Sequence, residues 1–225
     1  MLPFLFGLAF AGLPEDLADA ADTDLPTKTR EEAWGRLVKG GTARDLVRLA
    51  ELPDTPKNQR WVAIRALGPI PGDEARDAIL RYLEAKDAST RMAALGALGD
   101  RGDRALSGRV AAALSDKALL VRAAAAEALA KLGDPSTLGD LERALKDPTN
   151  SYRGTSMWVR RRFVETMAAI GTDAAVPYLA RALDDADADV SAAAVHGLEK
   201  VAGFSYAEGR TPEEEREAWR RWAGR

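Results

Sequence analysis

The sequence predicts an all-α fold, an α-solenoid of about five to six antiparallel helix pairs. One helical pattern recurs, with a polar residue followed seven positions later by leucine or methionine. From the copy at Arg60 onward, the spacing between copies is 31 residues, except for one interval of 38. The leading residues are Arg60, Arg91, Arg122, Arg160 and Ser191, and an earlier copy starts from Arg30. A fixed period of this length is typical of solenoids, whose repeats bury a core only by stacking.

Each repeat contains a second helix between two copies of the pattern, because apolar residues there recur at helical spacing. The copies lie at 28–41, 58–68, 89–99, 120–133, 158–171 and 189–201, and the second helices at 42–52, 73–85, 103–115, 136–147 and 174–185. Gly102, Gly133 and Gly171 stand where helices are expected to end. No long segment alternates with period two, so no extended sheet is expected.

An aspartate precedes the leading arginine by six residues in Asp54/Arg60 and Asp116/Arg122, and "LGD" closes two copies. This pattern resembles the HEAT-like repeats first recognised in phycobilisome lyases, over about residues 28–203. The resemblance implies buried aspartate–arginine ion pairs that link successive turns, and a concave binding surface. Departures from the pattern are the shorter Asp87/Arg91 spacing, the seven-residue insertion between Asp147 and Arg160, and the loss of arginine at Ser191.

The two ends of the chain differ from the repeats. Residues 1–11 are apolar and contain a small-x-small motif, which favours a signal peptide, although no Lys or Arg precedes Lys28. An apolar strand or helix that packs on the domain is the alternative. Residues 12–27 then form an acidic linker of little packing value. Residues 204–225 are expected to form a capping helix, begun by a capping box at Thr211 with Trp219 and Trp222 on one side.

Composition excludes several kinds of site. The chain has no cysteine and one histidine, so disulfides, thiolate catalysis and multi-histidine metal sites are ruled out. The net charge of −3 gives no general attraction to nucleic acid. We therefore expect a non-enzymatic scaffold without cofactor or metal, exported to the periplasm or cell envelope, with a cytoplasmic location as the alternative. No stable membrane span is expected, and the oligomeric state stays open.

The expected partner is a protein or peptide bound at two places. With the leading residue as position zero, columns +3, +4 and +7 form the core, and +1 and +5 face away from it; these columns include Trp61 and Arg65. The insertion at 148–158 brings Tyr152, Arg153 and Trp158 next to Arg161, residue types that dominate interface energetics.

Several alternatives remain. The insertion is also consistent with a tolerated loop whose tryptophan packs over helix ends, and removing Pro148–Gly154 is expected to leave the fold nearly intact. For function, the resemblance leaves open a phycobilin-lyase-like chromophore or assembly factor, and a glycosylase-like protein that binds DNA.

We predict that the mature chain begins near Gly12, because the small-x-small motif ends immediately before it. N-terminal sequencing of protein isolated from its own organism measures this directly. An intact Met1 in a cytosolic fraction would contradict export.

Overall fold

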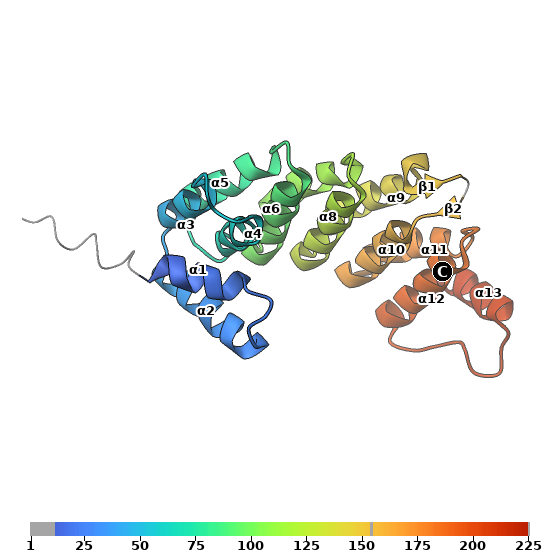
Figure 1. Ribbon diagram of the computed structural model, residues 1–225. Helices are drawn as coiled ribbons and strands as arrows, with labels where there is room; N and C mark the ends of the chain where they lie inside the picture. Colours follow the sequence, from blue (N-terminus) through green and yellow to red (C-terminus); the bar gives the residue numbers. More distant parts are fainter. Residues whose placement is uncertain (1–11, 154, 225) are drawn as a thin grey trace, which may run out of the picture. The chain divides into compact units, whose positions relative to one another are not determined.

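The computed structural model describes residues 12–153 and 155–224, and it confirms the all-α solenoid of helix pairs (Figure 1). The signal peptide predicted at 1–11 lies outside the described residues. The chain divides into two compact units, one ending at Arg101 and the other beginning at Gly102. In the part of the chain that the structure describes, no helix is both long and apolar enough to cross a membrane.

The first unit contains three helix pairs. Its helices are α1 (Leu13–Ala21), α2 (Thr27–Gly40), α3 (Ala43–Glu51), α4 (Lys57–Ala66), α5 (Asp73–Leu83) and α6 (Ala88–Arg101). The pairs α3–α4 and α5–α6 stack through contacts of α4 with α6 and of α3 with α5, whereas α1 packs on α2 and α4.

The second unit continues the pattern with shorter outer helices and a small hairpin. Its elements are η1 (Arg104–Leu106), α7 (Ser107–Ala112), η2 (Ala113–Ser115), α8 (Leu119–Leu132), η3 (Pro135–Thr137), α9 (Leu138–Lys146), η4 (Pro148–Asn150), β1 (Ser151–Tyr152), β2 (Thr155–Ser156), α10 (Trp158–Ile170), η5 (Asp173–Ala175), α11 (Val176–Ala182), α12 (Ala188–Ala202) and α13 (Pro212–Ala223). Helices α8, α10 and α12 lie side by side.

In the earliest copy Trp34 is half-buried; from Arg60 onward the predicted core columns are buried, apart from Val195, which is half-buried. The buried members are Ala63, Ile64, Leu67, Ala94, Leu95, Leu98, Ala125, Ala126, Leu129, Phe163, Val164, Met167, Ala194 and Leu198. Position +3 is alanine in four of these five copies, at Ala63, Ala94, Ala125 and Ala194, and lets neighbouring helices approach closely. In the second unit, the Thr166 hydroxyl of α10 donates to the Ala126 carbonyl of α8 at 3.2 Å.

Residues 13–21 form a helix and not part of the expected acidic linker. Leu13, Leu17 and Ala21 recur every four residues, so they share one side of α1, and all three are buried. Asp16 pairs with Arg36 of α2 at 2.6 Å. The acidic residues occupy the exposed side, which is why composition alone suggested a linker.

The leading arginines bind the carboxyl end of the preceding helix. Arg60 Nε donates to the Ala50 carbonyl at 2.9 Å, and Arg91 Nη1 donates to those of Ala85 and Lys86 at 2.8 and 2.9 Å. In the second unit the corresponding donors and acceptors are Arg122 to Asp116 at 2.8 Å, Arg160 to Leu145 at 3.0 Å and Ser191 to Leu183 at 3.1 Å. The last carbonyls of a helix lack partners within it, and Arg60, Arg160 and Ser191 donate to such carbonyls, whereas Arg91 and Arg122 bind carbonyls of the loop just beyond the helix.

The ion pair implied by the HEAT-like resemblance is present at Arg160, whose Nη2 lies 2.6 Å from Asp185 Oδ2. Both side chains are largely buried, with exposures of 16% and 14%. Arg122 instead extends Nη2 to the Thr149 carbonyl at 3.3 Å. The Thr149 amide and hydroxyl, together with the nearby Arg122 charge, lower the pKa of Asp147.

Helix α13 closes the second unit. Thr211 and Glu214 form the capping box, and Pro212 follows Thr211 in the first turn. Trp219 is fully buried and stacks on Phe204, with ring centroids 5.4 Å apart. The helix contacts α11 and α12, so its aromatic side covers the last repeat.

We expect Arg122→Ala to destabilise the protein by about 3 kcal/mol, because two main-chain carbonyls lose a charged donor in a buried place. Arg221→Ala is the matched control, since its side chain is 70% exposed and its ion pair with Glu217 is long, at 3.6 Å. Urea unfolding followed by circular dichroism measures both variants. Equal midpoints would show that the arginine column is not structural.

Candidate functional site

The six side chains predicted to bind a partner lie in different units. Trp61 and Arg65 belong to α4 of the first unit. Tyr152, Arg153, Trp158 and Arg161 belong to the hairpin and α10 of the second. Each group is therefore described by itself.

Arg65 is held firmly in the first unit. Its guanidinium lies over the Trp61 ring, 5.2 Å from the centroid, and forms an ion pair with Asp100 of α6. A Cβ at Gly96 would lie only 2.6–2.7 Å from atoms of Arg65. The absence of a side chain at Gly96 thus lets Arg65 lie across α6 and join two helices.

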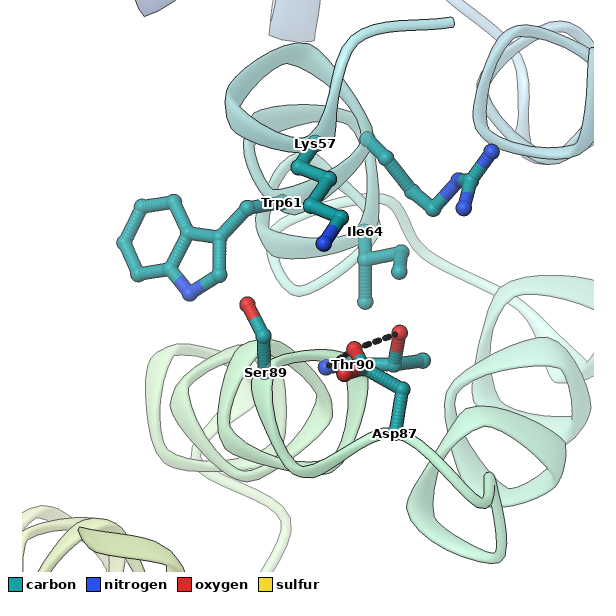
Figure 2. A pocket seen from close by; sticks show the side chains of 7 residues that line it. Lys57, Trp61, Ile64, Asp87, Ser89 and Thr90 are labelled. Atoms are coloured by element: carbon teal, nitrogen blue, oxygen red, sulfur yellow. Dashed lines mark hydrogen bonds between the residues drawn. The ribbon is translucent and has the colours of Figure 1, made fainter.

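A pocket of about 220 Å³ lies beside Trp61, between α4 and the start of α6 (Figure 2). Figure 2 shows the Lys57 ammonium and the Ser89 hydroxyl directed toward the pocket, with the Trp61 indole at its rim. Asp87 accepts hydrogen bonds from the Thr90 amide and hydroxyl, both at 2.9 Å. These bonds lower the pKa of Asp87, so this carboxylate acts as a helix cap and not as a proton acceptor poised near neutral pH.

The insertion in the second unit is anchored at its base. Asn150 is 1% exposed, and its Nδ2 donates to the Ala144 carbonyl at 2.9 Å. The Met157 amide donates to the Asn150 carbonyl at 3.0 Å, which closes the insertion. Between these points Ser151 pairs with Ser156 and Tyr152 with Thr155. The insertion is therefore a short hairpin whose base is anchored by the hydrogen bonds of buried Asn150.

The tip of the hairpin is exposed and strained. Tyr152 is 61% exposed, and the Arg153 guanidinium lies 5.3 Å from the centroid of its ring. Arg153 has φ = 50°, in the left-handed region that favours glycine. A non-glycine residue in this region is uncommon, and strain of this kind costs on the order of 1 kcal/mol. Nothing in the packing of the repeats requires an arginine here.

The first turns of α10 carry the other two predicted residues. Trp158 is 52% exposed, so it does not pack tightly over the helix ends. Arg161 lies three residues further along the helix, on the same side, and pairs with Glu165 at 2.8 Å. Beneath them Arg160 donates to the Ser156 hydroxyl at 3.1 Å, which fixes the hairpin to α10.

Sequence reasoning missed Leu120, which is 56% exposed in the first turn of α8. Leu120 stands two residues before Arg122, just as Trp158 stands two residues before Arg160. Because α8 and α10 pack side by side and the two residues occupy equivalent positions in the first turns of these helices, we assign both side chains to one surface. We call the surface formed by Leu120, Tyr152, Arg153, Trp158 and Arg161 the hairpin face.

Comparisons with known proteins agree with this architecture. A family model of HEAT repeats matches residues 45–108 and 99–157, and a model of PBS lyase HEAT-like repeats matches residues 159–185. The chain belongs to the HEAT-repeat family. No curated protein matches it.

Solved structures of other repeat proteins resemble this HEAT-repeat chain. One is a chain of the CpcE–CpcF complex of phycocyanin lyase from Nostoc sp. PCC7120, with a TM-score of 0.57 and 22% identity over 72% of this chain and 66% of that chain, just under two thirds of its length. YibA of E. coli has a TM-score of 0.55 and 20% identity, over 90% and 79% of the two chains. An engineered protein has a TM-score of 0.53 and 20% identity, over 86% and 90%. At these identities the likeness shows the fold alone.

The buried base changes what is expected when the insertion is removed. Deleting Pro148–Gly154 takes away Asn150 and the Thr149 carbonyl that Arg122 uses, so the sequence-based expectation of an intact fold does not fit the structure. We expect a loss of at least about 2 kcal/mol. Tyr152→Ser and Trp158→Ser, which alter exposed side chains only, should stay within about 0.5 kcal/mol. Thermal melts of the three variants test this, and an unchanged melting temperature of the deletion would contradict the anchoring.

Proposed function

We propose that this HEAT-repeat chain is a non-enzymatic adaptor that binds a protein or peptide segment through the hairpin face. The observation that carries the proposal is the hairpin itself, which has a buried base and a strained, exposed tip. Exposed aromatic and arginine side chains are the residue types that supply most binding energy at interfaces. The surface around Trp61 and Arg65 in the first unit is proposed as a second contact.

The ionisable groups near the hairpin face support binding more than catalysis. Asp185 is used by Arg160, and Glu165 by Arg161. A hydrogen bond from Ser156 lowers the pKa of Asp187, which keeps this carboxylate ionised at neutral pH. General acid–base catalysis needs a group whose pKa lies near the working pH, and these carboxylates are held in ion pairs or hydrogen bonds.

The location of the partner rests on the sequence alone. The apolar residues 1–11 favour export, and we propose that the partner is met in the periplasm or cell envelope. The phycocyanin lyase complex shares the fold with this chain at low identity, and the hairpin face offers no feature specific to a chromophore.

Site-specific photo-crosslinking tests the proposal. Benzoylphenylalanine placed at Tyr152 or Trp158 should yield a covalent adduct with one partner in cells of the native organism, identified by mass spectrometry. The same group at Leu52, which is 43% exposed in the first unit, is the control. Trp158→Ala should weaken binding of the identified partner about 30-fold, as expected for an interface hot spot.

Absence of an adduct at both hairpin positions would refute this function. An equally strong adduct from Leu52 would show non-specific contact and would refute it as well.

A further inference from the structure

Building on the proposed function, we infer that the hairpin face recognises an acidic–apolar protein segment, in which a carboxylate stands next to large apolar side chains. The inference rests on two features of this surface: a cation that lacks a carboxylate partner, and a pair of exposed apolar side chains on adjacent helices.

Arg153 provides the cation. Among residues 12–153 and 155–224, no carboxylate pairs with it, and its guanidinium is held over the Tyr152 ring. Among the described residues no acceptor binds the N–H groups of this guanidinium, so they remain for an acceptor on a partner. Arginine binds carboxylates through such groups with two parallel hydrogen bonds. The strained hairpin tip thus exposes the Arg153 guanidinium, which forms no ion pair within the described part of the chain.

The nearby carboxylates do not neutralise this guanidinium. Arg161 and Arg162 share Glu165, at 2.8 and 3.5 Å, so that pair of arginines keeps one positive charge in excess. Asp185 is bound by Arg160, and Asp187 by Ser156. The positive charge of Arg153 and of the Arg161–Arg162 pair is therefore complementary to a negatively charged group on the partner.

Leu120 and Trp158 provide the apolar part. Both are more than half exposed, and they occupy equivalent positions at the start of α8 and α10. Ala123 and Ala124 follow Leu120 by one helical turn, and both are half-buried and small. They leave space for the side chains of a bound segment next to Leu120 and Trp158. A segment that crosses both helices covers both apolar groups at once.

Nucleic acid is the competing ligand for a surface with arginine and aromatic residues. A nucleic acid would bring a run of phosphate groups past Glu127 of α8 and Glu165 of α10, whereas the proposed segment needs only one carboxylate, at Arg153. The charge pattern therefore favours a protein segment, and an oligonucleotide serves as the counter-test.

A library of random 12-residue peptides displayed on phage and selected on the full chain tests this specificity. The selected sequences should be enriched in Asp or Glu next to Leu, Ile, Phe or Trp. A synthetic peptide of the most enriched sequence should bind Arg153→Gln five- to tenfold more weakly and Leu120→Ser about tenfold more weakly. Arg143→Gln is the matched control, because this exposed arginine of α9 pairs with Asp140 and lies outside the hairpin face.

Selection without acidic enrichment, including selection that yields no binder, would overturn the inference. So would equal affinity of the peptide for Arg153→Gln and the original protein, with thermal melts confirming that the variant is folded. Tighter binding of a single-stranded oligonucleotide than of any selected peptide would also overturn it. The proposed function fails separately, when photo-crosslinking at Tyr152 and Trp158 yields no partner.

Discussion

The repeats from Arg60 to Ser191 depend on one interaction, a hydrogen bond from the leading residue of the inner helix to a carbonyl at or just beyond the carboxyl end of the preceding helix. The alanine-rich seams bury little area per residue, so they leave the angle between two helices weakly defined. Arg60 fixes that angle by binding the Ala50 carbonyl in the last turn of α3, and Arg91 by binding carbonyls of the loop that follows α5. Ser191 also donates to a main-chain carbonyl, that of Leu183, although serine carries no charge. The feature common to the column is therefore a hydrogen bond to this carbonyl and not a positive charge.

This constraint explains how the second unit accepts an insertion. Arg122 reaches past its own helix pair to the Thr149 carbonyl, and Asn150 caps the end of α9 through Ala144. The base of the insertion therefore takes part in the same polar network that orders the repeats. The tip takes no part in this network, so substitutions at Tyr152 and Arg153 are expected to leave the core unchanged. A repeat protein can in this way carry an exposed hairpin on an intact scaffold.

The parts of the structure that depend on helical register could be predicted from the sequence. The core columns, the paired helices and the capping box at Thr211 follow from spacing over a few turns. The features that were missed depend on residues distant in the sequence or on where a helix begins. The burial of Asn150 depends on carbonyls exposed by the end of α9, and the exposure of Leu120 depends on α8 beginning at Leu119. Helix α1 was missed because its apolar residues are spread through an acidic segment.

Two arginines stacked on aromatic rings illustrate why residue type alone does not identify a binding site. Arg65 lies over Trp61, yet it also pairs with Asp100 and crosses α6 at Gly96, so its donors serve the scaffold of the first unit. Arg153 lies over Tyr152 in a strained backbone conformation, and no carboxylate among the described residues satisfies it. The sequence places both arginines near an aromatic residue and does not separate the two cases. What separates them is a carboxylate: Asp100 pairs with Arg65 and makes that contact structural, whereas no carboxylate among the described residues pairs with Arg153, which is why we propose Arg153 as a recognition residue.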